Sequence, residues 1–221
     1  MAKEHTSAHD HVANFTSRQK RIALIVVATA FVMDLLDSTI VNVAIPSIQT
    51  NLGASFASIQ WLVAGYLLAF ATFLITGGRM GDVFGYKKIF LIGVGGFTIA
   101  SLLSGFAWSP EILIFTRILQ GASAALMVPQ VMSTMQIMYK PSERGAVNGL
   151  FGALGGLAAS LGPVIGGLLI QANLFNLDWR PIFFINVPVG IIAFILAVRY
   201  LPEGRSPHPL KLDFLVTFLR S

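Results

Sequence analysis

Six long apolar segments constrain the fold of this chain more than any other feature of its sequence. Each holds about 20 mostly apolar residues, the length that an α-helix needs to cross a hydrocarbon layer of ~30 Å. We predict spans at 21–45, 57–77, 88–108, 111–137, 146–172 and 182–201. The links between them are short and polar. The fold predicted from this pattern is an all-α polytopic membrane bundle of six transmembrane helices.

Composition agrees with the membrane prediction and excludes several functions. Charged residues make up 11% of the chain, against about 25% in soluble domains, and the mean hydropathy is +0.74. There are no cysteines, and the four histidines lie in polar end segments, so no metal site is predicted. Motifs of phosphate loops, zinc proteases and serine hydrolases are absent. We therefore predict no enzyme activity and no cofactor.

The basic residues indicate orientation in the bilayer rather than a nucleic-acid partner. The chain has 15 Lys and Arg residues. All except Arg117 and Arg180 fall in the leader, in the links after the second and fourth spans, or at the C-terminal end. Cytoplasmic segments carry such an excess of positive charge. We predict a cytoplasmic leader at 1–20, a cytoplasmic linker at 202–221 and a multi-pass location in the cell inner membrane, with both termini in the cytoplasm.

Three ionisable residues lie inside predicted spans, where they are costly and therefore indicate function. Asp34 and Asp37 belong to the first span and Arg117 to the fourth. A rise of 1.5 Å per residue places all three at roughly 20–24 Å from the inner boundary. If the two spans are neighbours, Arg117 can pair with one of the aspartates, and Gln120, one turn later, can share the network.

Asp34 and Asp37 are three residues apart and so share a helix face. Two carboxylates beside one arginine leave one negative charge over, and mutual repulsion together with desolvation favours protonation of one of them. Such a group can carry a proton or provide the counter-charge for a cationic substrate. The alternative is a buried ion pair that only fixes the register of the helices.

Two further segments combine glycine with charge or proline. The link after the second span holds Gly78, Asp82, Gly85, Lys87 and Lys88, with Asp82 expected at the N-terminus of the third span, where an anion is favoured. The fifth span holds Gly149, Gly162, Pro163, Gly166 and Gly167. Such a helix can bend and pack closely. An ordinary cytoplasmic turn and plain close packing are the alternatives.

Together these segments resemble a known family. The link at 78–88 resembles the signature loop of the major facilitator superfamily, Gly-x-Leu-Ala-Asp-Arg-x-Gly-Arg-Lys-Lys, and departs from it at Val83 and Tyr86. Arg117 with Gly121 resembles the family's fourth-span motif, and 162–167 resembles its fifth-span antiporter motif. The segments 36–46 and 178–190 resemble the 14-span drug:proton antiporters, the EmrB/QacA-like group.

The resemblance implies the N-terminal half of a proton-coupled multidrug exporter, with 212–215 resembling the start of a seventh span. Its partners would be the lipid bilayer, protons, hydrophobic or cationic small molecules, and a missing C-terminal half. Asp37, Arg117 and Asp34 would couple protons, and Asp34, Gln120 and Gln130 would contact substrate. The loop residues would switch conformation and the fifth-span glycines would form a hinge. The alternative is an inactive truncated product, or a half-transporter that needs a partner chain.

Overall fold

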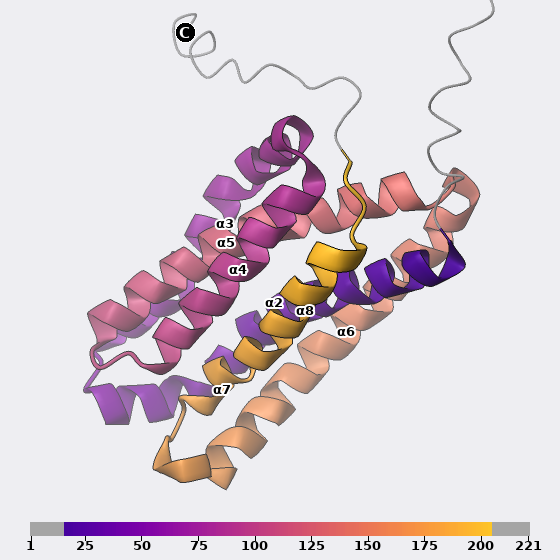
Figure 1. Cartoon of the computed structure of the whole chain (residues 1–221). Helices are drawn as coiled ribbons and strands as arrows, with labels where there is room; N and C mark the ends of the chain where they lie inside the picture. Colours follow the sequence, from indigo (N-terminus) through magenta and orange to yellow (C-terminus); the bar gives the residue numbers. More distant parts are fainter. Residues whose placement is uncertain (1–15, 205–221) are drawn as a thin grey trace, which may run out of the picture.

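The computed structural model describes residues 16–204, which form helices and turns without a strand in that range (Figure 1). The helices are α2 (Ser17–Leu52), α3 (Phe56–Phe84), α4 (Tyr86–Gly105), α5 (Pro110–Met138), α6 (Pro141–Ala172), the short 3-10 turn η2 (Leu174–Asn176), α7 (Pro181–Phe184) and α8 (Asn186–Tyr200). With α7 and α8 counted as one span, six helices are long and apolar enough to cross a membrane. The predicted six-helix fold is confirmed.

Capping explains why the helices run beyond the apolar segments. α2 begins at Ser17, inside the predicted leader, because the Thr16 hydroxyl accepts a hydrogen bond from the backbone of Gln19 while the Gln19 side chain accepts one from the backbone of Thr16. This reciprocal cap satisfies free N–H groups at the helix start. A prediction from apolar segments does not detect such polar first turns of a helix. Most of the predicted linker at 202–221 lies outside the described residues.

The helices form two groups of three (Figure 1). α5 packs between α3 and α4, with the largest contacts in the molecule, and we call these helices the α3–α4–α5 group. α2 packs against α6 and α8, which together form the α2–α6–α8 group. The two groups meet mainly where α4 contacts α8 and where α2 contacts α5. A side chain on α2 can therefore reach across the seam between the groups to α5.

Glycines allow the helices of the α3–α4–α5 group to approach closely. A Cβ atom at Gly77 of α3 would overlap the carbonyl of Ala125 on α5, and a Cβ at Gly121 of α5 would overlap the carbonyl of Tyr66 on α3. A Cβ at Gly93 of α4 would lie 2.7 Å from the backbone nitrogen of Met127. Small residues at helix contacts are typical of membrane bundles, where packing rather than the hydrophobic effect joins helices.

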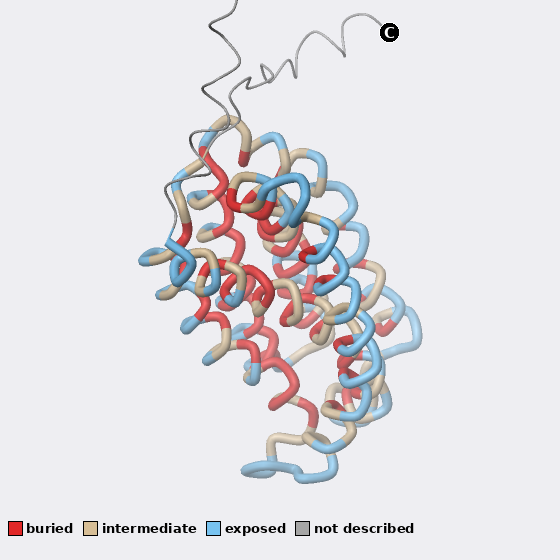
Figure 2. The backbone as a smooth tube through the Cα atoms, turned by 90° about the vertical axis from the view of Figure 1, so that its right-hand side faces the viewer, coloured by how far each residue is buried: buried red, intermediate tan, exposed pale blue. Residues whose placement is uncertain are grey.

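Large apolar side chains also cover the outside of the bundle. Figure 2 shows exposed residues along the outward side of the helices and buried residues along the sides that face each other. Leu67 of α3, Ile99 of α4 and Leu168 of α6 are 54–61% exposed. Water would penalise so much exposed apolar surface, whereas lipid chains accept it. The exposed surface thus agrees with a bundle embedded in a bilayer.

A polar cluster joins the helices at the end opposite the α3–α4 turn. Asn51, in the last turn of α2, donates to Asp178 at 2.8 Å and accepts from the indole of Trp179 at 3.3 Å. Arg180 donates to the carbonyls of Gly105 and Ala107 at 3.0 and 2.6 Å, at the C-terminal end of α4. These bonds hold the segment before α7 against both α2 and α4, and so fix where α8 starts.

Candidate functional site

An ion pair between α2 and α5 lies at the centre of the bundle. The Nη1 atom of Arg117 donates to Oδ2 of Asp37, and the two side chains are 2% and 0% exposed. Within residues 16–204 this is the only salt bridge. The pairing of Arg117 with a first-span aspartate is therefore confirmed, and the partner is Asp37. The pair crosses the seam between the two helix groups.

Three further polar side chains complete the shell around this pair. The second oxygen of Asp37, Oδ1, accepts from the amides of Gln120 and Asn186, each at 2.8 Å. Gln120 also accepts from Arg117 at 2.8 Å and donates to the hydroxyl of Ser101 at 2.8 Å. Both carboxylate oxygens of Asp37 thus have donors. The cluster joins α2, α4, α5 and α8 through hydrogen bonds.

Aromatic rings enclose the remaining surface of the Arg117 guanidinium. Its central carbon lies 4.2 Å from the centroid of the Tyr66 ring and 5.9 Å from that of Phe183. A cation over an aromatic face is stabilised by the ring quadrupole, more strongly where water is excluded. The Nε atom of Arg117 has no hydrogen-bond partner among the described residues. The arginine therefore keeps one spare donor inside the bundle.

Asp34 has a different partner from Asp37. It is 7% exposed, and its Oδ1 accepts from the hydroxyl of Tyr66 on α3. Of the two aspartates expected beside Arg117, only Asp37 contacts it directly. Because the two residues project about 60° apart around the helix, packing against α3 on one side and α5 on the other separates them. Tyr66 connects the two carboxylates, since it bonds Asp34 and supports Arg117.

Gln130 does not join this cluster. It lies ten residues beyond Gln120 on α5, about 15 Å along the helix, and is fully buried at the contact with α3. Its amide donates to the carbonyls of Gly77 at 2.8 Å and Leu126 at 3.0 Å. Helix packing encloses this side chain at the contact between α3 and α5, and the predicted substrate contact at Gln130 stays a prediction.

The glycine-containing link after the second span is shorter than predicted. Gly78 and Asp82 belong to the last turns of α3, and only Gly85, with φ 98° and ψ 136°, separates α3 from α4. Asp82 therefore ends α3 instead of starting the third span, and its carboxylate accepts from the hydroxyl of Tyr86 at 2.8 Å. Lys87 and Lys88 occupy the first turn of α4. The positive φ at Gly85 explains the need for glycine there.

The fifth-span glycines face two directions. A Cβ at Gly162 would overlap the hydroxyl of Thr39, and a Cβ at Gly166 would lie 2.7 Å from the Ile40 side chain, so this face of α6 lies against α2 just beyond Asp37. Gly149 and Gly167 have no atom within 4 Å of such a Cβ. Pro163 lies inside α6, next to the contact. The tight part of the predicted motif is thus the side that touches α2.

Sequence reasoning missed three members of the cluster, namely Tyr66, Ser101 and Asn186. These three residues carry no charge, and nothing in their spacing indicates which face of a helix they occupy. Asn186 lies within the segment noted only for its resemblance to a family pattern. The signal that could have identified Asn186 is a strongly polar amide inside an apolar span, since the cost of a polar group in the membrane also selected Asp34 and Asp37.

Comparison with known proteins gives a consistent result. The sequence profile of the Major Facilitator Superfamily matches residues 27–215. The chain is 47% identical over 191 residues to a probable actinorhodin transporter of Streptomyces coelicolor, covering 86% of this chain and 33% of that protein. It is 40% identical over 188 residues to the tetracenomycin C resistance and export protein of Streptomyces glaucescens, covering 85% and 34%.

A solved structure supports the fold. The human organic anion transporter MFSD10 (TETRAN) superimposes with a TM-score of 0.65 at 18% sequence identity, covering 83% of this chain and 48% of that one. At this identity the likeness concerns the fold alone. The chain spans about a third of the length of the two Streptomyces relatives.

Proposed function

The chain belongs to the major facilitator superfamily, and on that premise we propose that it forms the first six membrane-spanning helices of a proton-coupled multidrug exporter. The observation that carries the proposal is the buried carboxylate of Asp37, bonded to Arg117, Gln120 and Asn186. Ionisable groups buried in a membrane bundle mark ion pathways. Two Streptomyces relatives, named as a probable actinorhodin transporter and a tetracenomycin C resistance and export protein, support the direction of transport.

Asp37 and Arg117 form the proposed coupling pair. A proton on Asp37 removes the negative charge that balances Arg117 and replaces an acceptor oxygen by a hydroxyl. This loss of charge weakens the hydrogen bonds from the three donors, because charge-assisted hydrogen bonds are roughly twice as strong as neutral ones. Since Asp37 and Arg117 lie on different helix groups, the loss weakens the seam between these groups. Protonation thereby favours a second arrangement of the bundle.

Asp34 is the proposed counter-charge for cationic substrates, or alternatively a second proton site. Its bond to Tyr66 places it one turn from the coupling pair, while the Tyr66 ring supports Arg117. A substrate cation that draws Asp34 away from Tyr66 disturbs the surroundings of Arg117. Gln120, which contacts both members of the pair, relays such a change to Asp37.

Two glycine-containing segments are the proposed conformational elements. Asp82 and Tyr86 hold α3 to α4 across Gly85, beside Gly78, Lys87 and Lys88 at the proposed cytoplasmic surface. In α6, the face containing Gly162 and Gly166 lies against α2 next to Pro163. Elsewhere α6 meets α2 through larger side chains, such as Phe151 on Phe31, so the small residues at this face are where α6 can slide or bend with little steric cost. Movement of α6 therefore acts on α2 and on Asp37.

The proposed transport path lies between this bundle and a second one. Substrate sites of such transporters form at the interface of two repeats, and alternating access rocks one repeat against the other. The proposed orientation has both ends of the described chain on the cytoplasmic side of the inner membrane. A partner chain that supplies the second bundle is the alternative to a continuous polypeptide.

The direct test measures proton exchange. Everted membrane vesicles from cells that express the complete transporter are acidified inside, and the pH gradient is monitored with an acridine dye. We expect addition of a hydrophobic cation such as ethidium to release protons from the lumen. Vesicles from cells without the transporter give the control. Ethidium accumulation that leaves the pH gradient unchanged would contradict proton coupling, and absence of accumulation would contradict export.

A further inference from the structure

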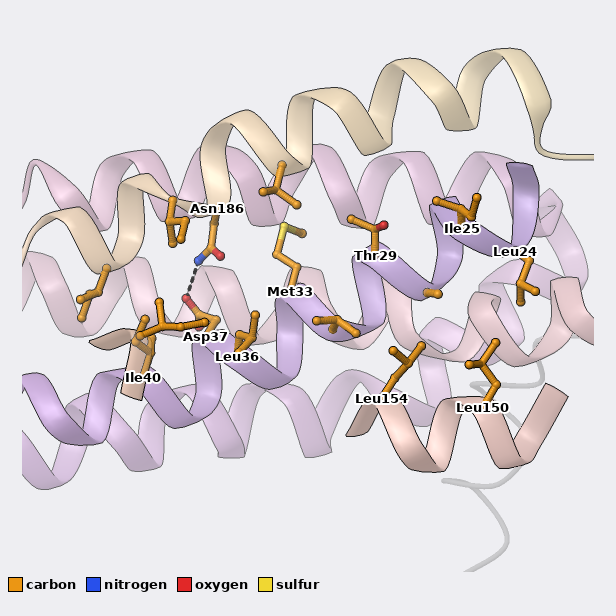
Figure 3. A pocket seen from close by; sticks show the side chains of 16 residues that line it. Leu24, Ile25, Thr29, Met33, Leu36, Asp37, Ile40, Leu150, Leu154 and Asn186 are labelled. Carbon is orange, nitrogen blue, oxygen red and sulfur yellow. Dashed lines mark hydrogen bonds between the residues drawn. The ribbon is translucent and has the colours of Figure 1, made fainter. Parts of the chain in front are cut away.

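A groove of about 400 Å³ runs along α2 between α6 and α8 (Figure 3). α2 forms its floor, and α6 and α8 form its sides. Its walls are almost entirely apolar, with representative side chains Val32, Leu36, Leu150, Leu154 and Val189. Small-molecule sites of proteins are mostly apolar cavities of roughly 300–1,000 Å³ that contain a few polar groups. The size and lining of the groove fall within this class.

The groove has a polar site where Asp37 of the coupling pair and Asn186 line it. Asn186 lines the groove and donates from Nδ2 to Asp37 at 2.8 Å, as the dashed line in Figure 3 marks. Asn186 is 4% exposed, yet within residues 16–204 no group donates to its Oδ1. The oxygen is not among the fully buried atoms without a partner in this range, so it keeps some accessible surface. It can therefore accept a hydrogen bond from a donor on a molecule bound in the groove.

A second polar group lies further along the same groove. Thr29 of α2 is half-buried, and its hydroxyl bonds to none of the described residues. It stands eight residues before Asp37, about 12 Å along the helix. Between Thr29 and Asn186 the groove thus presents an apolar stretch with a free hydroxyl on one side and a free amide oxygen on the other, and apolar lining continues beyond both.

We infer that this groove binds a neutral lipophilic small molecule whose hydroxyl or N–H group donates to Oδ1 of Asn186. The only charged lining residue, Asp37, already has donors for both oxygens, so the groove offers no counter-charge. A charged ligand would lose its hydration between apolar walls without compensation. A lipid acyl chain fits the walls but has no donor for Asn186. The occupant is therefore a compact molecule that partitions into the bilayer.

The position of Asn186 connects this site to the coupling pair. One side chain would bond the ligand through its oxygen and Asp37 through its nitrogen. A bound molecule therefore fixes the Asn186 amide in the orientation that donates to Asp37. The proposed binding site is argued from the geometry of the groove alone, and only its effect on efflux rests on the proposed function. An experiment can therefore disprove binding without disproving transport, and the reverse.

The test uses N-phenyl-1-naphthylamine, a neutral dye with one N–H donor that fluoresces in apolar surroundings. The purified chain is placed in lipid nanodiscs, and empty nanodiscs provide the lipid background. We expect saturable binding above this background, and binding about fivefold weaker for the N-methylated dye, which lacks the donor. Equal binding of the two dyes would overturn the assignment of Asn186 as acceptor.

Two variants locate the dye. Asn186→Leu should remove the difference between the two dyes, and Val32→Phe should fill the groove and abolish saturable binding of both while keeping Asn186 and its bond to Asp37. Ile192→Phe is the matched control, because Ile192 is 58% exposed on α8 and does not line the groove. Unchanged binding in Val32→Phe would show that the dye dissolves in lipid around the protein, and would overturn the site even if Asn186→Leu fails to fold.

Discussion

The ring of Tyr66 lies under the guanidinium of Arg117 at 4.2 Å, while its hydroxyl bonds the carboxylate of Asp34. One tyrosine on α3 therefore supports the cation that pairs with Asp37 and also satisfies the second aspartate of α2. The two carboxylates have separate partners but share this neighbour. A change at either carboxylate is thus transmitted through a single side chain, and the predictions below separate their roles.

Asp37→Asn should abolish the pH dependence of efflux. Asparagine keeps the shape of the side chain but cannot exchange a proton, so a pH gradient no longer changes its charge. The measurement is ethidium transport into everted vesicles that contain the complete transporter, with and without a pH gradient. Glu203→Gln, at an exposed carboxylate outside the cluster, serves as control. A pH dependence that survives in Asp37→Asn would exclude this carboxylate as the coupling group.

Arg117→Ala should destabilise the bundle by roughly 3–5 kcal/mol, because it leaves the buried Asp37 carboxylate without its cation. Thermal unfolding in detergent gives the comparison with the unsubstituted chain. The double variant Asp37→Asn/Arg117→Ala should be more stable than Arg117→Ala alone, since it removes the unpaired charge. Strict additivity of the two single changes would show that the residues are not energetically coupled.

Asp34→Asn should weaken the binding of cationic substrates selectively. Loss of a counter-charge worth about 1.4 kcal/mol raises the dissociation constant tenfold. A neutral substrate of similar size should bind as before. The measurement compares ethidium with a neutral dye in titrations of the complete transporter. Tyr66→Phe is the control, because it removes the partner of Asp34 and keeps the charge. An equal loss for both substrates would favour a structural or proton-binding role for Asp34.

Gly121→Ala and Gly156→Ala should change stability in opposite directions. A Cβ at Gly121 would overlap the backbone carbonyl of Tyr66, and such overpacking costs about 1–3 kcal/mol. A Cβ at Gly156 meets no atom within 4 Å, so alanine should stabilise α6 by up to about 1 kcal/mol through its better helix propensity. Thermal unfolding of both variants provides the comparison. Equal effects would contradict the close contact of α3 with α5.

The sequence predicts the six spans because the length of an apolar segment can be counted along the chain without knowledge of how the helices pack. The similar depths of the three charges also predict that Arg117 can pair with one of the two aspartates if the first and fourth spans are neighbours, but they do not select Asp37. The sequence does not predict that Asp34 bonds Tyr66, because the direction in which a side chain leaves its helix depends on neighbouring helices. For the same reason it does not predict that Gln130 bonds the carbonyl of Gly77 at the contact between α3 and α5.

Boundaries between helices are the least predictable feature. The glycines of the link at 78–88 predict a turn, with Asp82 at the start of the third span. Gly78 and Gly81 instead continue α3 as helix, and the chain turns only at Gly85. Glycine permits both a turn and a close helix contact, and Gly81 lies against Gln130 on α5. Only the neighbouring helix distinguishes the two uses.

The sequence separation within the polar cluster has a consequence for biogenesis. Asp34 meets Tyr66 after 32 further residues of synthesis, but Asp37 receives Arg117 only after 80 and Asn186 only after 149. Chains are made from the N-terminus, so the nascent first helix carries two carboxyl groups before Arg117, the cation that pairs with Asp37, exists. An ionised aspartate alone in hydrocarbon is costly. The nascent helix must therefore enter the lipid with Asp37 protonated, or remain beside the insertion machinery until the fourth span arrives.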